Sequence, residues 1–523
     1  MKSDSPALEF KRSGRSRGGL RKRLRNGTKT SRWGASLAAR LRRTPLWQRV
    51  LLVLLLLPPV LAGGTATAYY LRLHQSAQNL SVDELPLFPS PEKGRRYLIL
   101  APHCDDETLA VGGFVADASR KGAHVSVAFL TNGDGFPAAA SRELHEVNIS
   151  PSDYVRFARR RQTEAGRALQ TLGVAPRDTY FLGYPDRGLR ALWETNWLPS
   201  QPFRSAYTCH THSPYPVCFT RNAAYNGEFL RGDLARLMKQ VRPTDIFVTH
   251  PADDHPDHSA AATFAQSALR ACDAEQPGGG GWARTARLHY YIVHRGDWPL
   301  PQGKRPGADL TPPPGLVTTD TKWRTYMLSY ETRAIKERAL ARYVSQLNIS
   351  GRFLTSFLRA NELFGEMNAP TVPDGTDGWT TVAVDGRRDD VVRYVDPSAD
   401  LTSISVRRTA PNFLTVRVSL RGAAETNRLR YTLQLRDGNN LRTVSLSSPK
   451  NGVGYILTAS VPLGDPGASY LWVAAETRYQ GTDNLPMRPV DRIGYRPFLL
   501  NPLRPDPDVS ETHHPGNSSA QGR

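Results

Sequence analysis

The chain has 523 residues, more than one hydrophobic core usually holds, so we expect at least two folded units. Hydrophobic residues make up 39% and charged residues 22%, which is ordinary globular composition and excludes a collagen, a coiled coil or a wholly disordered chain. The formal net charge is +20, but residues 1–49 alone hold 15 Lys and Arg against two acidic residues, a net +13. Most of the excess is therefore a basic tail, and we expect no nucleic-acid partner.

An uncharged stretch follows this tail. Val50 to Ala68 contains no charged residue, and about 20 residues suffice to cross a bilayer as a helix. Because positive residues stay on the cytoplasmic side, the sequence predicts a basic cytoplasmic tail at 1–49 and a single-pass transmembrane anchor at 50–70. The remainder is then extracytoplasmic. Cleavage of a signal peptide near Ala68, followed by secretion, is the alternative interpretation.

Apolar strands alternate with amphipathic helices between residues 92 and 365. Short apolar runs lie at 96–103, 124–133, 178–186, 245–251 and 286–293. In the segments between them, apolar residues recur at the spacing of an amphipathic helix. This alternation predicts an α/β fold with a Rossmann-like parallel sheet and helices on both faces. Ligands of such sheets bind beyond the carboxyl ends of the strands, so we expect any site at that edge.

Polar residues crowd the ends of two of these strands. The first strand runs into His103-Cys104-Asp105-Asp106-Glu107, and the fourth runs into a segment from His250 to His258 that is rich in His and Asp. Three His or Asp ligands with an open position for water are typical of a catalytic zinc site. One such cluster alone more often caps a helix. Two clusters at the same edge of a sheet indicate a catalytic metal site with a carboxylate available as base.

These segments resemble the PIG-L/LmbE-like zinc-dependent N-deacetylases. The segment from His103 to Glu107 is similar to that family's HPDDE motif, with Cys104 in place of proline, and the segment from His255 to His258 matches its HPDH motif. Shorter matches lie at 131–134, 161–173, 181–186 and 336–346. The resemblance covers residues 96 to about 350 and implies hydrolysis of the acetamido group of a glucosamine-type sugar.

The resemblance implies three metal ligands. His103, Asp106 and His258 take the positions of the family's zinc ligands. We expect Zn²⁺, with Fe²⁺ as the alternative because His and carboxylate ligands accept both. Cys104 is expected to point into the packing rather than toward the metal, as a small buried hydrophobe.

The resemblance also implies the chemistry of five further residues. Asp105 takes the place of the general base, and His255 that of the group that stabilises the oxyanion. Asp257 takes the place of a partner that orients a histidine. Arg161 and Asp186 stand where the family contacts sugar hydroxyls.

Two cysteines lie close together in the sequence and could form a disulfide. Cys209 and Cys218 bracket a short loop with two prolines, and in an exported protein such a pair would form a disulfide. A metal knuckle that also uses His210 and His212 is the alternative.

The pattern changes in the last third of the chain. A helix is predicted at 332–347, the deacetylase-like domain at 92–365 and a linker at 366–380. From 381 to 500 apolar and polar residues alternate, which predicts a C-terminal β-sandwich domain that either binds carbohydrate or packs on the first domain. Residues 501–523 are predicted to be a disordered tail.

Together these features predict a membrane-tethered, metal-dependent N-deacetylase acting on an N-acetylated sugar in a glycan or glycoconjugate. Its partners would be that substrate and the membrane. Two alternatives stay open: another amidase on the same scaffold, of the type that cleaves a thiol-sugar conjugate, and a catalytically inactive glycan-binding protein. The export signal argues against the first, and the intact Asp105 against the second.

Overall fold

The structure is a computed structural model, which describes residues 63–72 and most of 81–501, together with four single residues, Pro45, Leu55, Leu57 and Gln75. Gaps fall at 276–280, 318, 374–377, 387–390, 411, 449–453, 465–468 and 482–488. The described residues from Tyr69 to Asn501 belong to one compact unit.

The predicted membrane anchor lies mostly outside the described residues, as do the basic tail and the C-terminal tail beyond residue 501. Residues 63–72 are helical. Among the residues that the structure describes, no helix is long and apolar enough to cross a membrane. The anchor at 50–70 therefore stays a prediction.

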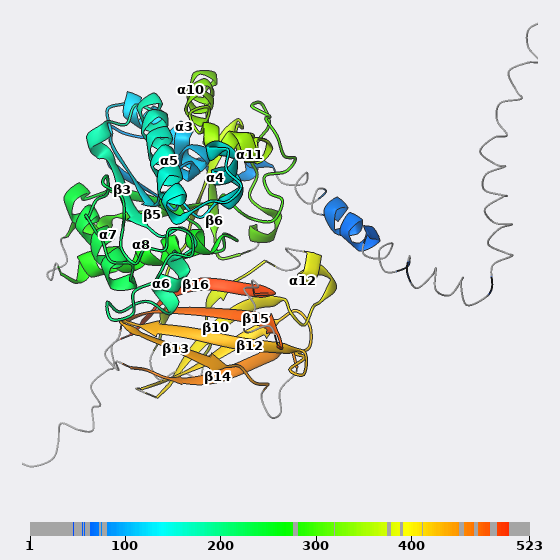
Figure 1. The fold of residues 1–523 in the computed structure, drawn as a ribbon. Helices are drawn as coiled ribbons and strands as arrows, with labels where there is room; N and C mark the ends of the chain where they lie inside the picture. Colours follow the sequence, from blue (N-terminus) through cyan, green and yellow to red (C-terminus); the bar gives the residue numbers. More distant parts are fainter. Residues whose placement is uncertain are drawn as a thin grey trace, which may run out of the picture. The chain divides into compact units, whose positions relative to one another are not determined.

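A seven-stranded sheet forms the centre of the first domain, in the order β3-β2-β1-β4-β5-β7-β6 (Figure 1). Its parallel part matches the predicted strands: β1 (Arg96–Ala101), β2 (His124–Thr131), β3 (Thr179–Tyr184), β4 (Asp245–Thr249) and β5 (Arg287–Tyr291).

The predicted parallel sheet continues at one edge into two antiparallel strands that the sequence did not indicate. There β7 (Asn361–Glu366) pairs antiparallel with β5, and β6 (Lys322–Met327) pairs antiparallel with β7. Charged residues interrupt the apolar pattern of both strands, for example Arg324 and Glu362, so neither strand resembles a buried run.

Helices cover both faces of the sheet, because successive side chains of a strand point to opposite sides. Leu98 and Leu100 of β1 join one core cluster, and Ile99 and Ala101 join the other. The Leu98 face is covered by α6 (Leu189–Glu194), α7 (Gly227–Val241) and α8 (Pro256–Ala274), and the Ile99 face by α3 (Asp106–Arg120), α5 (Pro151–Thr171) and α10 (Tyr330–Leu340).

The helix predicted at 332–347 is two helices. α10 ends at Leu340, and α11 (Val344–Thr355) begins after a short turn. Tyr343 in this turn is buried and donates a hydrogen bond from its hydroxyl to Glu107 Oε1 at 2.5 Å, which explains the break. The remaining short helices are η1 (Val82–Glu84), α4 (Pro137–Leu144), η2 (Pro176–Asp178), α9 (Trp282–Thr285), η3 (Pro314–Leu316) and α12 (Val391–Val395).

A second, all-β region follows, as predicted. Its two sheets have the orders β14-β11-β10-β9 and β13-β12-β15-β16-β8. The alternating apolar residues of both sheets form a third core cluster, which includes Val416 and Leu433. The strands are β8 (Thr371–Val372), β9 (Thr380–Val384), β10 (Leu401–Ala410), β11 (Phe413–Leu420), β12 (Leu429–Asp437), β13 (Asn440–Ser445), β14 (Ile456–Pro462), β15 (Tyr470–Tyr479) and β16 (Asp491–Leu500).

The β-sandwich packs on the α6–α8 face of the first domain. Rings of Trp472 and Tyr495 lie 5.6 and 5.7 Å from the ring of Trp193 in α6. Trp472 also donates from Nε1 to Gln266 Oε1 of α8 at 3.2 Å. The core cluster on this face of the central sheet thus continues into the sandwich.

Candidate active site

The first motif forms a tight turn between β1 and α3. Asp105 is the N-cap of α3 and has a φ of 143°, a backbone conformation that L-residues rarely adopt and that clusters at functional sites. Two contacts hold this turn: the Asp105 peptide N–H donates to Glu107 Oε2 at 3.2 Å, and Arg161 donates to the Cys104 carbonyl at 2.7 Å.

The second motif begins α8. His255 is the N-cap, and its Nδ1 accepts a hydrogen bond from the Asp257 peptide N–H at 3.2 Å. Pro256 occupies the first turn of the helix, where its missing N–H leaves no carbonyl unpaired. Burial, together with the nearby His103 and His258, lowers the pKa of His255 well below its usual value. A neutral His255 whose Nδ1 is an acceptor carries its proton on Nε2.

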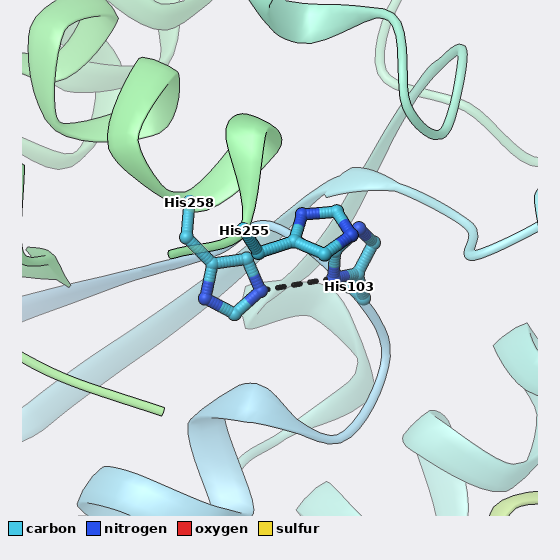
Figure 2. A group of neighbouring side chains, drawn as sticks. All are labelled: His103, His255 and His258. Carbon is cyan, nitrogen blue, oxygen red and sulfur yellow. Dashed lines mark hydrogen bonds between the residues drawn. The ribbon is translucent and has the colours of Figure 1, made fainter. Parts of the chain in front are cut away.

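Three ligand atoms from these motifs converge. His103 Nδ1 lies 3.1 Å from His258 Nε2 (Figure 2), and Asp106 Oδ2 lies 3.4 and 3.2 Å from those two nitrogens. Ligands of a tetrahedral zinc ion with bonds of about 2.0 Å are separated by roughly 3.3 Å. All three separations fit that geometry.

A carboxylate lies behind each of the two imidazoles. Asp253 Oδ2 is 3.2 Å from His258 Nδ1, and Asp186 Oδ1 and Asp257 Oδ2 are 3.2 and 3.5 Å from His103 Nε2. Such partners fix the ring orientation of metal-binding histidines. Burial opposes the charge on His258, but Asp106 and Asp253 outweigh it and raise its pKa to about 9. The site is therefore electrostatically suited to a cation at the point where the ligand atoms meet.

Asp257 also anchors a neighbouring loop. Its carboxylate accepts from the peptide N–H groups of Arg187 and Leu189 at 2.5 and 3.0 Å. It thus ties the segment after β3 to the start of α8, beside Asp186, whose Oδ2 accepts from the Gly135 N–H at 2.7 Å.

The candidate base lies next to an arginine. Asp105 Oδ2 is 3.3 Å from Arg161 Nη2. Burial raises the pKa of Asp105 to about 7 even though Arg161 opposes the shift. Arg161 also donates to the Gly133 carbonyl at 3.0 Å, and a Cβ at Gly133 would lie 1.6 Å from Arg161 Nη1, so only glycine fits there. Arg161 therefore packs tightly against the turn that presents Asp105.

Two further imidazoles lie close by. Ligand atoms of His103, His255 and His258 lie within 4.8 Å of one another, as do those of Asp106, His258 and His294, and those of His103, Asp186 and Asp257. His294 was not among the predicted site residues, although it follows β5 at the same edge of the sheet, where ligand-binding residues are expected. Burial and the nearby His258 lower its pKa to about 4.

A cavity of about 200 Å³ opens onto this cluster. Its apolar wall, which the sequence did not predict, comes from Phe136 before α4 and from Phe353 and Leu354 of α11. The Phe353 ring stacks on His294 with centroids 5.3 Å apart. Six of the eight predicted site residues also line the cavity: His103, Asp105, Asp106, Arg161, Asp186 and His255. The other two, Asp257 and His258, are fully buried beside it.

The predicted disulfide is absent. Cys209 and Cys218 are both free, and the Cys218 thiol donates to the carbonyls of Tyr215 and Thr220 at 3.1 Å each. The metal knuckle is absent as well, since none of the candidate metal groups among the described residues includes either cysteine. Cys104 is fully buried within a core cluster, as expected.

Residues 98–269 match the profile of a family described as PIG-L: GlcNAc-PI de-N-acetylase. These residues form a PIG-L domain. The match confirms the resemblance drawn from the motifs, and it includes the turn after β1 and the start of α8, which supply the converging ligand atoms.

The curated relatives of the PIG-L domain carry one name. A "1D-myo-inositol 2-acetamido-2-deoxy-alpha-D-glucopyranoside deacetylase" of Thermobifida fusca is 26% identical over 309 residues, which cover 55% of this chain and 98% of that protein. A protein of the same name from Kribbella flavida is 25% identical, over 54% of this chain and 95% of its own. Among solved structures, an N,N'-diacetylchitobiose deacetylase from Pyrococcus horikoshii is 17% identical with a TM-score of 0.32, over 52% of this chain and 82% of its own.

Proposed function

We propose that this chain is a zinc-dependent N-deacetylase that hydrolyses the acetamido group of an N-acetylated sugar in a glycan or glycoconjugate. The observation that carries the proposal is the triangle of His103 Nδ1, Asp106 Oδ2 and His258 Nε2, with edges of 3.1 to 3.4 Å, inside a PIG-L domain. Its dimensions and its mixture of imidazole and carboxylate suit zinc, with Fe²⁺ as the alternative.

The metal would be held by these three residues. When bound, zinc would supply a Lewis acid that polarises the acetamido carbonyl and makes a water molecule more acidic. Asp253 behind His258, and Asp257 with Asp186 behind His103, hold the two imidazoles in the orientation that binding requires.

The remaining site residues divide the proton transfers between them. Asp105 accepts a proton from the attacking water and returns it to the leaving amine, a role that suits a carboxyl whose pKa is raised to about 7 by burial. Arg161 holds this carboxylate at 3.3 Å. His255, neutral and protonated on Nε2, donates to the oxygen that becomes negative during hydrolysis.

The size of the cavity supports a small substrate-binding site. Its volume of about 200 Å³ is below the roughly 300 Å³ at which pockets for drug-sized ligands begin, so it suits a single sugar ring. Arg161 and Asp186 line it and would contact hydroxyl groups. The name of the curated relatives supports a 2-acetamido-2-deoxy-glucopyranoside as the reacting unit. The anchor at 50–70 would place this reaction at the outer face of a membrane.

The test is acetate release from a substrate panel. Zinc-loaded protein is given an inositol-linked N-acetylglucosaminide, N-acetylglucosamine oligomers and a thiol-sugar amide conjugate, with Asp105→Asn as the paired variant. We expect acetate from at least one N-acetylglucosaminide and none above background from the variant. Cleavage of the thiol conjugate alone would establish the other amidase. Binding of an oligomer without any cleavage would establish the inactive glycan-binding protein.

A further inference from the structure

The β-sandwich reaches the loop that leads into the candidate metal site. This loop, residues 250–255, connects β4 to α8. Three separate contacts from the second domain meet it at or near three successive residues, His250, Pro251 and Ala252.

The closest contact is a backbone approach at a glycine. Gly494 in β16 lies so near the loop that a Cβ built on it would stand 2.2 Å from the Pro251 carbonyl oxygen. Real Cβ atoms do not come so close to a backbone oxygen, so any side chain at this position forces the strand and the loop apart. Because residue 494 has no side chain, β16 can lie this close to the backbone of Pro251.

The second contact passes through a turn before β6. Arg496, two residues beyond Gly494, lies with its Nε 3.5 Å from Asp320 Oδ2. The next residue in that turn is Thr321, and its Oγ1 is hydrogen-bonded to His250 Nε2 at 2.9 Å. Both Arg496 and His250 are buried, so the sandwich fixes the first residue of the loop through this turn.

The third contact uses an arginine between the domains. Arg295 donates from Nη1 to the Ala252 carbonyl at 2.9 Å and to Asp254 at 3.2 Å. Its Nη2 lies 3.6 Å from the carboxylate of Asp385, which follows β9 in the sandwich. A buried guanidinium held from both sides positions the carbonyl that it contacts.

The residue that follows these three is the partner of a candidate ligand. Asp253 Oδ2 lies 3.2 Å from His258 Nδ1 and also accepts from the peptide N–H groups of Val293 and His294 at 3.0 Å each. A shift of the loop backbone therefore moves the carboxylate that orients His258.

We propose that the β-sandwich positions loop 250–255, which carries the Asp253 partner of the candidate ligand His258, with Gly494 as the positioning residue that sets the distance between β16 and Pro251. The proposal rests on the proposed metal-dependent function. It gives the second domain a role in the affinity of the site for its metal, separate from any binding of substrate.

The test compares two glycine-to-alanine variants of the full-length chain. Gly494→Ala crowds Pro251. Gly422→Ala is the matched control, since its Cβ would stand 2.7 Å from the backbone of Pro397 within the sandwich, away from the loop. Zinc affinity is measured by competition with a chelator, beside the melting temperature and the KM and kcat at saturating zinc. We expect Gly494→Ala to weaken zinc binding about 10-fold or more, as loss of an orienting partner does. KM should stay near the wild-type value.

Gly422→Ala should lower the melting temperature while leaving zinc affinity unchanged. Wild-type zinc affinity in a folded Gly494→Ala variant would overturn the proposal, as would an equal loss of affinity in both variants. If Gly494→Ala does not fold, zinc affinity is measured instead on Asp385→Asn, which removes the charge facing Arg295. Failure of the wild-type chain to bind zinc at all would instead overturn the proposed function.

Discussion

The two ends of the central sheet both carry a buried Asp–His contact, and only one of them has the geometry of a metal site. At the amino end, Asp245 Oδ1 lies 3.0 Å from His289 Nε2, and its Oδ2 lies 2.5 Å from Arg95. At the carboxyl end, Asp106 Oδ2 lies 3.2 Å from His258 Nε2, and that nitrogen lies 3.1 Å from a second imidazole, His103.

The difference lies in what surrounds the carboxylate. Asp245 is surrounded by donors from His289, Thr244 and Arg95, and these hydrogen bonds lower its pKa despite burial. At the carboxyl end, two imidazole nitrogens face each other as well as the carboxylate, an arrangement that a cation would stabilise. The larger cavity, about 690 Å³, lies at the amino end. Neither an Asp–His contact nor cavity size identifies the site, whereas convergence of three ligand atoms does.

The largest effect is expected from His258→Ala. Removing one corner of the triangle should abolish zinc binding and reduce acetate release by at least about 1,000-fold, equivalent to about 4 kcal/mol of transition-state stabilisation. The measurement is bound zinc by elemental analysis together with acetate release. A variant that keeps stoichiometric zinc would show that another set, such as one with His255 or His294, holds the metal.

Asp105→Asn should separate metal binding from chemistry. The variant is expected to retain zinc, because Asp105 is not a corner of the triangle, and to lose about 100- to 10,000-fold in kcat because the proton acceptor is gone. Zinc content and kcat are measured on the same preparation. Near-normal kcat with zinc bound would remove Asp105 from the proposed role.

Asp253→Asn tests the support behind His258. We expect zinc affinity to fall about 10- to 100-fold, as for other partners of metal-bound histidines, with activity restored by excess zinc. Chelator competition gives the affinity. Unchanged affinity would mean that the backbone of the loop alone orients His258.

Asp245→Asn is the matching change at the amino end and should have the smallest effect on activity. We expect the free energy of unfolding to fall by about 1–3 kcal/mol because buried donors lose a charged acceptor. Changes far from the site should leave kcat/KM within about twofold. A large loss of bound zinc or of kcat in this variant would contradict the proposal that only the carboxyl end of the sheet forms the metal site.

The same residue predicts a pH dependence of stability. The folded-state pKa of Asp245 lies below its ordinary value, so its contribution is fully present above the unfolded-state pKa of about 4. That contribution is lost as the pH falls through the folded-state pKa. Chemical denaturation of wild type and Asp245→Asn between pH 6 and pH 3 should show the two curves converging at the acid end. Parallel curves would exclude the role of this carboxylate.

The sequence predicted the parallel part of the sheet and the meeting of its two motifs, because strand ends in such a sheet share one edge. It could not predict the wall formed by Phe136 and Phe353, since apolar residues in helices give no sign of which cavity they line. His294 was missed because no recognisable motif surrounds it, although its place just after β5 at the same edge of the sheet could have indicated it. The break at Tyr343 depends on a hydrogen bond to Glu107, 236 positions away.

The second domain shows the same limit more strongly. Period-two alternation predicted its strands, but Gly494 and Pro251 lie far apart in the chain, and nothing in either segment alone shows that their backbones touch. Cys209 and Cys218 illustrate the opposite error, in which proximity in sequence suggested a bond that the local fold does not form.

The proposed metal site is tested most directly by a zinc titration of the metal-free full-length protein, with acetate release from an N-acetylglucosaminide followed at each step. Activity should rise in proportion to bound zinc and reach its maximum at one equivalent per chain, with neither binding nor activity in His258→Ala. Full activity in the folded, metal-free protein, or zinc binding that His258→Ala does not affect, would contradict the proposed site.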